Sequence, residues 1–310
     1  MNEFEIIRRY FTRAPRRSLT GVGDDCALVQ PDAGMELAIS TDMLIESRHF
    51  LPGAEPRSLG HKALAVNLSD MAACGATPRW ATLAIALKEA DERWLGAFAE
   101  GLFALADRYR VDLVGGDTTR GPLVTINMTI FGEVPAGLAH HRAGARPGDD
   151  IWVSGELGAA ALALKRPDIA AAAKRLHEPE PRVELGERLR GVATSAIDVS
   201  DGLAGDLGHI LERSEAGALV YYERLPKHGA FSGLNDPALE RDCVLSGGDD
   251  YELLFTAPQS ARPEIEALAR ELALPLARVG SIQAGEAKLT VLDASGKPVP
   301  TRGGFDHFVP

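Results

Sequence analysis

The sequence contains little cysteine and no closely spaced pair of cysteines. The three thiols, Cys26, Cys74 and Cys243, are an odd number, lie far apart and form no CxxC motif. Disulfide-rich secreted domains and structural zinc sites both depend on paired or clustered cysteines. We therefore expect reduced thiols, a cytoplasmic location and no disulfide framework.

Long apolar runs and clusters of positive charge are also missing. The longest apolar runs, such as residues 81–87, are far too short to span a bilayer, and residues 1–5 show no secretory signal. The 33 Lys and Arg residues are outnumbered by 44 Asp and Glu residues, which gives a net charge of −11. Because nucleic acids are bound by clustered basic residues, the sequence predicts no nucleic-acid partner and no membrane partner.

The standard nucleotide-binding and nucleophile motifs are absent as well. There is no GxxxxGK[ST] loop, and Gly21-Val22-Gly23 does not continue into GxGxxG because Cys26 occupies the last position. No GxSxG turn presents a nucleophilic serine, and no His or Cys pair has zinc spacing. These absences exclude a P-loop, a dinucleotide fingerprint and a serine hydrolase.

Length and hydrophobic periodicity predict two mixed domains. A chain of 310 residues with 45% hydrophobic residues is more naturally two domains than one, and the aperiodic segment 135–147 places the boundary between domains 1–138 and 139–310. After a helix near residues 2–12, the first domain is expected to follow the order β-α-β-α-β-β. Its strands are expected at 36–40, 80–87, 111–114 and 123–134, and its helices at 58–74, with Ser58 as N-cap, and 91–109. The second domain is expected to be another mixed α/β layer structure, so the fold class is α+β.

Acidic residues recur where short apolar runs end in hydroxyl or glycine residues. We interpret Ala38 to Asp42 as a strand that delivers oxygen ligands at its end, and four further segments show related patterns. The five segments are 21–25, 38–42, 111–117, 196–202 and 244–250. Taken singly, each is more readily explained as a turn, because Asp and Gly favour turn conformations.

Convergence of these segments would require bound cations. Two carboxylates ~5 Å apart repel by about 3 kcal/mol at an effective dielectric of 20, and a bound cation relieves that repulsion. The donors are almost all oxygen atoms, which are the ligands that magnesium prefers. The pattern therefore predicts a magnesium and phosphate site.

Six motifs taken together resemble the thiamine-monophosphate kinase family. They are GVGDDCAL at 21–28, STD at 40–42 with His49-Phe50, AVNLSD at 65–70, GDTT at 116–119, DVSDG at 198–202 and GGDDYEL at 247–253. The resemblance extends across residues 4–308, and single motifs are shared with aminoimidazole-ribotide synthetase, selenophosphate synthetase and their relatives. It implies an N-terminal α+β domain whose mixed sheet dimerises into a barrel, a C-terminal α/β domain, and hence a homodimer.

The same resemblance assigns functional positions. The positions that bind magnesium match Asp25, Ser40, Thr41, Asp42, Asp70, Asp117, Asp198 and Asp201. The positions that bind ATP match Gly116, Asp117, Arg142 and Ser200. The positions that hold the thiamine part match His49, Asp249 and Phe305. Beyond metal-assisted transfer, no catalytic side chain is implied.

Each assigned position also has a plainer interpretation. A carboxylate can be a cap or a turn residue, Arg142 a solvated surface residue, and His49 an ordinary histidine. Asp70 is the most persuasive on chemistry alone, because a carboxylate late on an apolar helix disfavours burial unless something positive compensates for it. Asp249 and Phe305 replace the Glu and the Tyr or Trp common in the family, so looser binding of thiamine is expected.

Three further carboxylates are not assigned as ligands. We interpret Asp24 and Asp250, which adjoin matched positions, as supporting residues. Asp206 follows Asp201 by five residues, off its helical face, and we interpret it as structural.

The implied reaction is direct in-line transfer of the ATP γ-phosphoryl group to thiamine monophosphate, which gives thiamine diphosphate and ADP. A phosphate monoester has its second pKa at about 6, so the acceptor is already anionic and a general base contributes little. Magnesium and Arg142 would screen the two polyanions and orient them. Two alternatives stay open: an ATP-dependent ligase of the same superfamily with another acceptor, and a thiamine-phosphate or divalent-metal binding protein without turnover.

Overall fold

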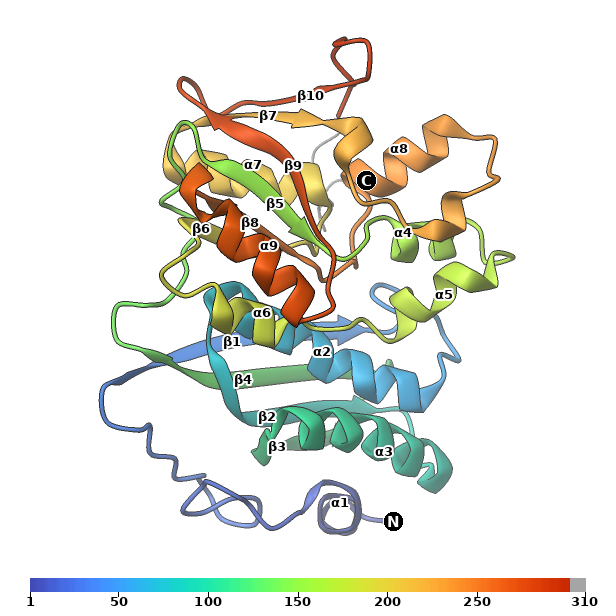
Figure 1. Ribbon diagram of the computed structural model, residues 1–310. Coiled ribbons are helices and arrows are strands. Elements are labelled where there is room, and N and C mark those ends of the chain that lie inside the picture. Colours follow the sequence, from blue (N-terminus) through green and yellow to red (C-terminus); the bar gives the residue numbers. More distant parts are fainter. Residues whose placement is uncertain (302–310) are drawn as a thin grey trace. The chain divides into compact units, whose positions relative to one another are not determined.

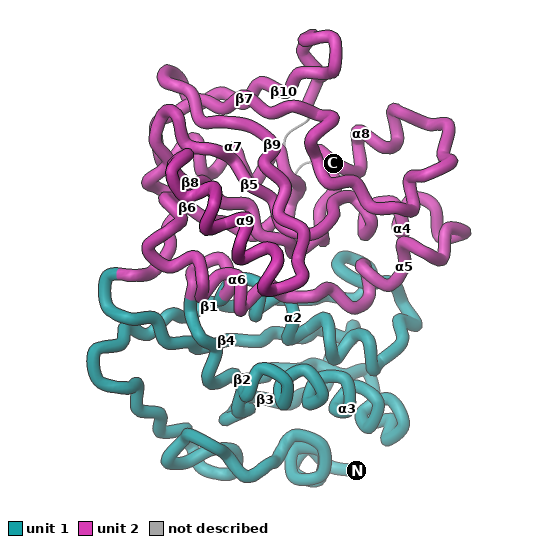
Figure 2. Tube along the Cα trace, in the orientation of Figure 1, with its two compact units in different colours: residues 1–71, 76–137 teal, residues 72–75, 138–310 magenta. Residues whose placement is uncertain are grey.

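The computed structural model describes residues 1–301 and divides the chain into two compact units (Figure 2). Unit 1 comprises residues 1–71 and 76–137, and unit 2 comprises residues 72–75 and the chain from residue 138 onward. In the part of the chain that is described, every helix is too short or too polar to cross a bilayer.

Unit 1 is a four-stranded mixed sheet packed against two long helices (Figure 1). The sheet has the order β1-β4-β2-β3, in which only the β2–β3 pair is parallel. This confirms the predicted succession β-α-β-α-β-β. The elements are α1 (Glu3–Ile6) with the π-helical turn η1 (Ile7–Phe11), β1 (Met35–Ile45), α2 (Pro56–Cys74), β2 (Thr77–Leu87), α3 (Glu92–Tyr109), β3 (Asp112–Arg120) and β4 (Thr125–Pro135).

The two faces of this sheet differ in chemistry because side chains alternate along each strand. Ile126, Met128 and Ile130 of β4 are at most 1% exposed and face the helices. On the opposite face, which we call the open face, Leu37, Ile39 and Met43 of β1 are 39%, 58% and 49% exposed. Unit 1 thus buries one apolar face and leaves a second, partly apolar face uncovered.

Helices α2 and α3 approach each other closely through two glycines. A Cβ atom added to Gly60 would clash with the carbonyl oxygen of Phe98, and one added to Gly101 would clash with that of Arg57. The N-cap of α3 is Asp91, whose carboxylate accepts hydrogen bonds from the Arg93 and Trp94 amides.

The predicted N-cap of α2 was wrong. Ser58 lies inside the first turn, and the carboxylate of Glu55 accepts the hydrogen bonds of the Arg57 and Ser58 amides. The helix therefore begins at Pro56, whose missing N–H needs no partner at this position.

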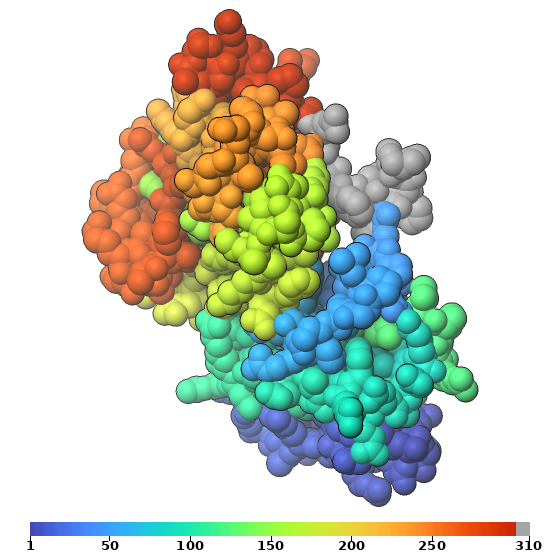
Figure 3. All heavy atoms as spheres, turned by 90° about the vertical axis from the view of Figure 1, so that its right-hand side faces the viewer, coloured from blue at the N-terminus to red at the C-terminus, as the bar shows by residue number. Residues whose placement is uncertain are grey.

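Up to residue 301, unit 2 contains a six-stranded mixed sheet with the order β10-β7-β9-β5-β8-β6, and among its described pairs only β10–β7 is parallel. On the face shown in Figure 3, α8 (orange) lies beside the yellow-green segment of α4 and α5. The strands are β5 (Asp150–Ser154), β6 (Ser195–Asp198), β7 (Gly217–Tyr221), β8 (Leu253–Ala257), β9 (Leu276–Gln283) and β10 (Leu289–Leu292). The α-helices are α4 (Ala159–Lys165), α5 (Ala170–His177), α6 (Val183–Arg188), α7 (Leu203–Ser214), α8 (Pro237–Ser246) and α9 (Arg262–Glu271).

Two of the expected strand ends were wrong. Strand β1 continues past Asp42 to Ile45, because its pairing with β4 extends to Ile45 and Thr125. Asp117 likewise lies within β3, where it pairs with Ala84. The run that ends in Ser246 belongs to helix α8. A short apolar run does not distinguish a strand from a helix, and its polar neighbours do not mark the end of pairing.

We predict that Gly101→Ala lowers the melting temperature, because its methyl group must displace the Arg57 backbone of α2. Overpacking of this kind costs about 1–3 kcal/mol. Gly96→Ala, on the same helix, is the matched control: its nearest neighbour, Tyr10 Cε1, is 3.8 Å from the added atom. That control should gain up to about 1 kcal/mol from helix propensity. Equal thermal shifts for the two variants would contradict the close crossing.

Candidate functional site

Ser40, Asp42 and Asp70 lie on the helix-covered side of the unit 1 sheet. Ser40 pairs with the buried Ile130, and Asp42 pairs with Met128, so both side chains share the buried face. The Ser40 hydroxyl donates a hydrogen bond of 2.5 Å to the carboxylate of Asp70 on α2. Helix α2 thus brings a third oxygen-bearing residue to this strand, and Asp70 is only partly buried.

Thr41 faces the opposite side of the sheet. Its hydroxyl donates to the Met128 carbonyl (3.0 Å) and lies 3.2 Å from both the Asn127 amide nitrogen and the Thr129 hydroxyl. Asp117 of β3 and Asn127 of β4 both pair with Ala84 of β2, so the two side chains lie on the same face of the sheet, on either side of Ala84. Thr41 and Asp117 therefore lie on the opposite face of the sheet from Ser40 and Asp42, although Ser40, Thr41 and Asp42 are consecutive in the sequence.

Asn127 and Thr129 were missed by the sequence analysis. The signal that identifies them is the alternation of Thr125, Asn127 and Thr129 with the apolar residues of β4, which marks a polar row on the open face. Gly116, in the adjacent edge strand, has φ 147° and no room for a side chain against the Leu83 backbone. A glycine is required there.

His49 and Asp25 lie in loops of unit 1. The Ile45 amide donates to His49 Nδ1 over 3.0 Å, so Nδ1 is the acceptor nitrogen and the neutral ring carries its proton on Nε2. This contact orients the imidazole directly after β1. Asp25 is exposed, and its amide donates to the Asp24 carboxylate (3.1 Å).

In unit 2, two loops that carry predicted site residues are joined by backbone hydrogen bonds. The Asp249 amide donates to the Ser200 carbonyl, and the Tyr251 amide donates to the Val199 carbonyl, both over 2.8 Å. Gly248 lies so close to the Ser200 carbonyl that a Cβ atom would clash with it. Ser200 and Asp249 are therefore neighbours, which the sequence alone did not indicate.

The conformation of the second loop is unusual. Asp249 and Tyr251 have φ values of 72° and 51°, a left-handed conformation that costs energy for residues other than glycine. Between them, Asp250 is 5% exposed, and its carboxylate accepts the Gly158 amide at the start of α4. Burial raises the pKa of Asp250 well above its usual value. The buried Asp250 carboxyl, through the hydrogen bonds it accepts from the Gly158 amide, thus holds the loop in this strained conformation.

Asp206 is a second buried carboxyl in unit 2. It is 2% exposed and accepts hydrogen bonds from the Ser200 and Asp201 amides, both 3.1 Å long. Burial, followed by the charges of Asp198 and Asp201, raises the pKa of Asp206 to about 8. Asp198 itself is 4% exposed, at the end of β6.

The structure says little about the functional roles of two predicted site residues, Arg142 and Phe305. Arg142 is exposed in the segment before β5, where its carbonyl accepts the Ser214 hydroxyl (3.3 Å). Phe305 lies outside the described residues.

The oxygen donors are suited to magnesium but are distributed over both units. Asp25, Asp42, Asp70 and Asp117 belong to unit 1, whereas Asp198 and Asp201 belong to unit 2. Within residues 1–301, no three acidic, His or Cys side chains form a metal-binding group by themselves. Carboxylates and hydroxyls fit a magnesium ion that also takes ligands from phosphate and water.

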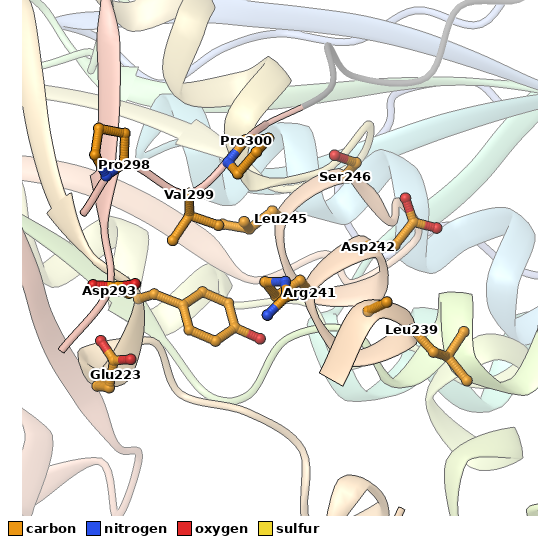
Figure 4. A pocket seen from close by; sticks show the side chains of 12 residues that line it. Glu223, Leu239, Arg241, Asp242, Leu245, Ser246, Asp293, Pro298, Val299 and Pro300 are labelled. Carbon is orange, nitrogen blue, oxygen red and sulfur yellow. The ribbon is translucent and has the colours of Figure 1, made fainter. Parts of the chain in front are cut away.

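Unit 2 also contains a cavity of about 610 Å³ beside α8 (Figure 4). Two of its four charged residues have described partners: Asp242 pairs with Lys165, and Asp293 accepts the amides of Ser295 and Lys297. The lining consists of Tyr222, Glu223, Ala238, Leu239, Arg241, Asp242, Leu245, Ser246, Asp293, Pro298, Val299 and Pro300.

Comparison with known proteins gives consistent matches. Residues 23–134 match the N-terminal domain model of AIR synthase related proteins, and residues 146–291 match the C-terminal domain model. The chain is 45% identical to thiamine-monophosphate kinase of Salmonella typhimurium, over 99% of this chain and 98% of that protein. It is 41% identical to the Haemophilus influenzae protein of the same name, with the same coverage.

Solved structures agree in fold. Thiamine-monophosphate kinase from Stenotrophomonas maltophilia superimposes with a TM-score of 0.86 at 45% identity, over 96% of both chains. AaThiL complexed with AMPPCP and TMP gives a TM-score of 0.78 at 29% identity, over 90% of this chain and 89% of that chain. On full-length similarity and shared fold, the chain belongs to the thiamine-monophosphate kinase family.

Proposed function

We propose that this protein transfers the γ-phosphoryl group of ATP to thiamine monophosphate and so produces thiamine diphosphate. The observation that carries the proposal is the 45% identity to thiamine-monophosphate kinases over 99% of the chain. The AMPPCP and TMP bound by AaThiL support the choice of substrates. The assay is formation of thiamine diphosphate from ATP, magnesium and thiamine monophosphate. Failure to form it would refute the proposal.

The chain's own residues would bind and orient rather than exchange protons. We propose Ser40, Asp42 and Asp70 as magnesium ligands, together with the other five assigned oxygen donors, Asp25, Thr41, Asp117, Asp198 and Asp201. We propose Gly116, Asp117, Arg142 and Ser200 as ATP contacts. Bound magnesium would neutralise phosphate charge during in-line transfer. Arg142 would supply a planar pair of donors to phosphate oxygens. The 1–138 domain would then serve ATP and metal binding as well as dimerisation.

His49, Asp249 and Phe305 are the proposed contacts for the thiamine part. They also separate this proposal from a superfamily ligase, which would need another acceptor pocket. ATP consumption measured with thiamine monophosphate and with ribotide acceptors, in separate reactions, distinguishes the two. Within residues 1–301, the three cysteines form no disulfide, which fits our further proposal of a cytoplasmic location.

We predict that Asp42→Asn reduces turnover at least about 100-fold, because the amide keeps the shape but removes the charge that binds magnesium. Turnover should be measured across a magnesium titration, and the circular dichroism of the variant should be unchanged. Asp32→Asn removes the same charge from an exposed site of unit 1 and should leave turnover intact. An unchanged rate for Asp42→Asn at limiting magnesium would refute the ligand role.

We predict that Phe305→Ala raises the Michaelis constant for thiamine monophosphate but not for ATP. A cation on an aromatic face contributes about 0.5–2 kcal/mol, which corresponds to roughly a 2- to 30-fold increase. Steady-state kinetics with each substrate varied in turn measure it, with Phe308→Ala as the neighbouring control. Equal losses for both substrates would indicate that Phe305 packs rather than binds.

We also propose a homodimer that forms through the open face of the unit 1 sheet. The exposed apolar row of Leu37, Ile39 and Met43 supports this, because apolar residues gathered on one face mark interaction surfaces. The two sheets would face each other as a barrel.

We predict that Ile39→Glu converts the dimer to a monomer, because a carboxylate would be buried in the interface without a partner. Light scattering after gel filtration measures the mass. Leu19→Glu, at a side chain that is 70% exposed but outside the sheet, is the control and should remain dimeric. A dimeric Ile39→Glu variant would exclude this face.

A further inference from the structure

The loop from Asp198 to Gly202 is fixed by hydrogen bonds on two sides. On one side, the Val199 amide donates to the Glu252 carbonyl, and the Val199 and Ser200 carbonyls accept amides of the 249–251 loop, all over 2.8 Å. These bonds continue the pairing of β6 with β8 beyond Asp198. The hydrogen bonds named on this side join backbone groups.

On the other side, the side chain of Asp206 holds the loop. The amides of Ser200 and Asp201 both donate to the same oxygen of Asp206, Oδ2, over 3.1 Å. Asp206 lies in the first turn of α7, and its own amide donates to the Gly202 carbonyl (3.0 Å). Its carboxyl group is therefore held by the helix that the loop leads into.

Gly202 makes this arrangement possible. It has φ 105°, a conformation that favours glycine, and an added Cβ atom would lie 2.7 Å from the carbonyl carbon of Ser246. Helix α7 begins directly after this residue, at Leu203. Asp206, at 2% exposed, is consequently enclosed beneath the residues whose amides it accepts.

We propose that Asp206 is a positioning residue for nucleotide binding. It acts by fixing the backbone of Ser200 and Asp201, which are the proposed ATP and magnesium contacts, and the inference rests on that part of the proposed function. Its Oδ2 atom already accepts two amides, and its burial keeps it from the surface that Ser200 and Asp201 reach. Asp206 therefore acts through the loop and does not itself bind the nucleotide.

The test uses two substitutions of Asp206 in the full-length protein. Asp206→Ala removes the acceptor of two partly buried amides, and we expect about a tenfold rise in the Michaelis constant for ATP at fixed magnesium. The constant for thiamine monophosphate should stay unchanged. Asp206→Asn keeps an acceptor oxygen on a side chain of the same length, and we expect it to stay within about threefold of the wild type.

Asp149→Ala is the matched control. Asp149 is also buried in unit 2, at 5% exposed, and also accepts two hydrogen bonds, from the Arg146 amide and the Thr194 hydroxyl. It holds a turn that carries none of the proposed ATP contacts. We expect this variant to melt at a lower temperature with an unchanged constant for ATP.

Direct binding separates this inference from the proposed reaction. Calorimetric titration of each variant with magnesium and AMPPCP reports nucleotide affinity without turnover. If the wild type binds AMPPCP but forms no thiamine diphosphate, the proposed reaction fails while the role of Asp206 is still measured. A loss in Asp206→Asn equal to that in Asp206→Ala would identify a charged ligand and overturn the positioning role. If Asp206→Ala and Asp149→Ala have the same affinity for AMPPCP and the same Michaelis constant for ATP, Asp206 only stabilises the fold and the positioning role is wrong.

Discussion

The alternation of side chains along the strands of unit 1 is the constraint on which its other features depend. It places Ile126, Met128 and Ile130 against the helices and leaves Ile39 and Met43 exposed. It also assigns consecutive polar residues of β1 to different faces. A single strand can thus carry oxygen donors toward α2 and, one residue later, contribute to a surface suited to a second subunit. A shift of register by one residue would exchange both functions.

Unit 2 organises its polar residues in another way. Here, backbone hydrogen bonds hold the 198–202 and 249–251 loops together, and a buried carboxyl group fixes the conformation of each loop. Asp206 accepts amides from one loop, and Asp250 connects the other to the start of α4. Burying a carboxyl is costly unless its hydrogen bonds are satisfied, so these anchors favour one loop conformation over others. The left-handed backbone at Asp249 and Tyr251 is maintained by the same contacts.

The proposed chemistry explains why the polar residues are mostly acidic in a protein that binds anions. Two phosphate-bearing substrates repel each other, and cations held by carboxylates remove that repulsion more effectively than single basic side chains. The acceptor needs no strong base, because a phosphate monoester is largely ionised near neutral pH. The main task of the fold is then to place the residues that bind metal and phosphate. Buried residues such as Asp206 therefore matter even though they do not contact substrate.

The sequence by itself determined the element order of the first domain, the mixed α+β class, the absence of standard nucleotide loops and the family. Periodicity and ordered motifs carry this information locally. Tertiary structure decided the rest. Strand pairing with β4 carried β1 past Asp42, and it placed Asn127 beside Thr41. Loop contacts made Asp249 a neighbour of Ser200, and burial made Asp206 an anchor. These outcomes depend on contacts between residues far apart in the chain, which no local pattern encodes.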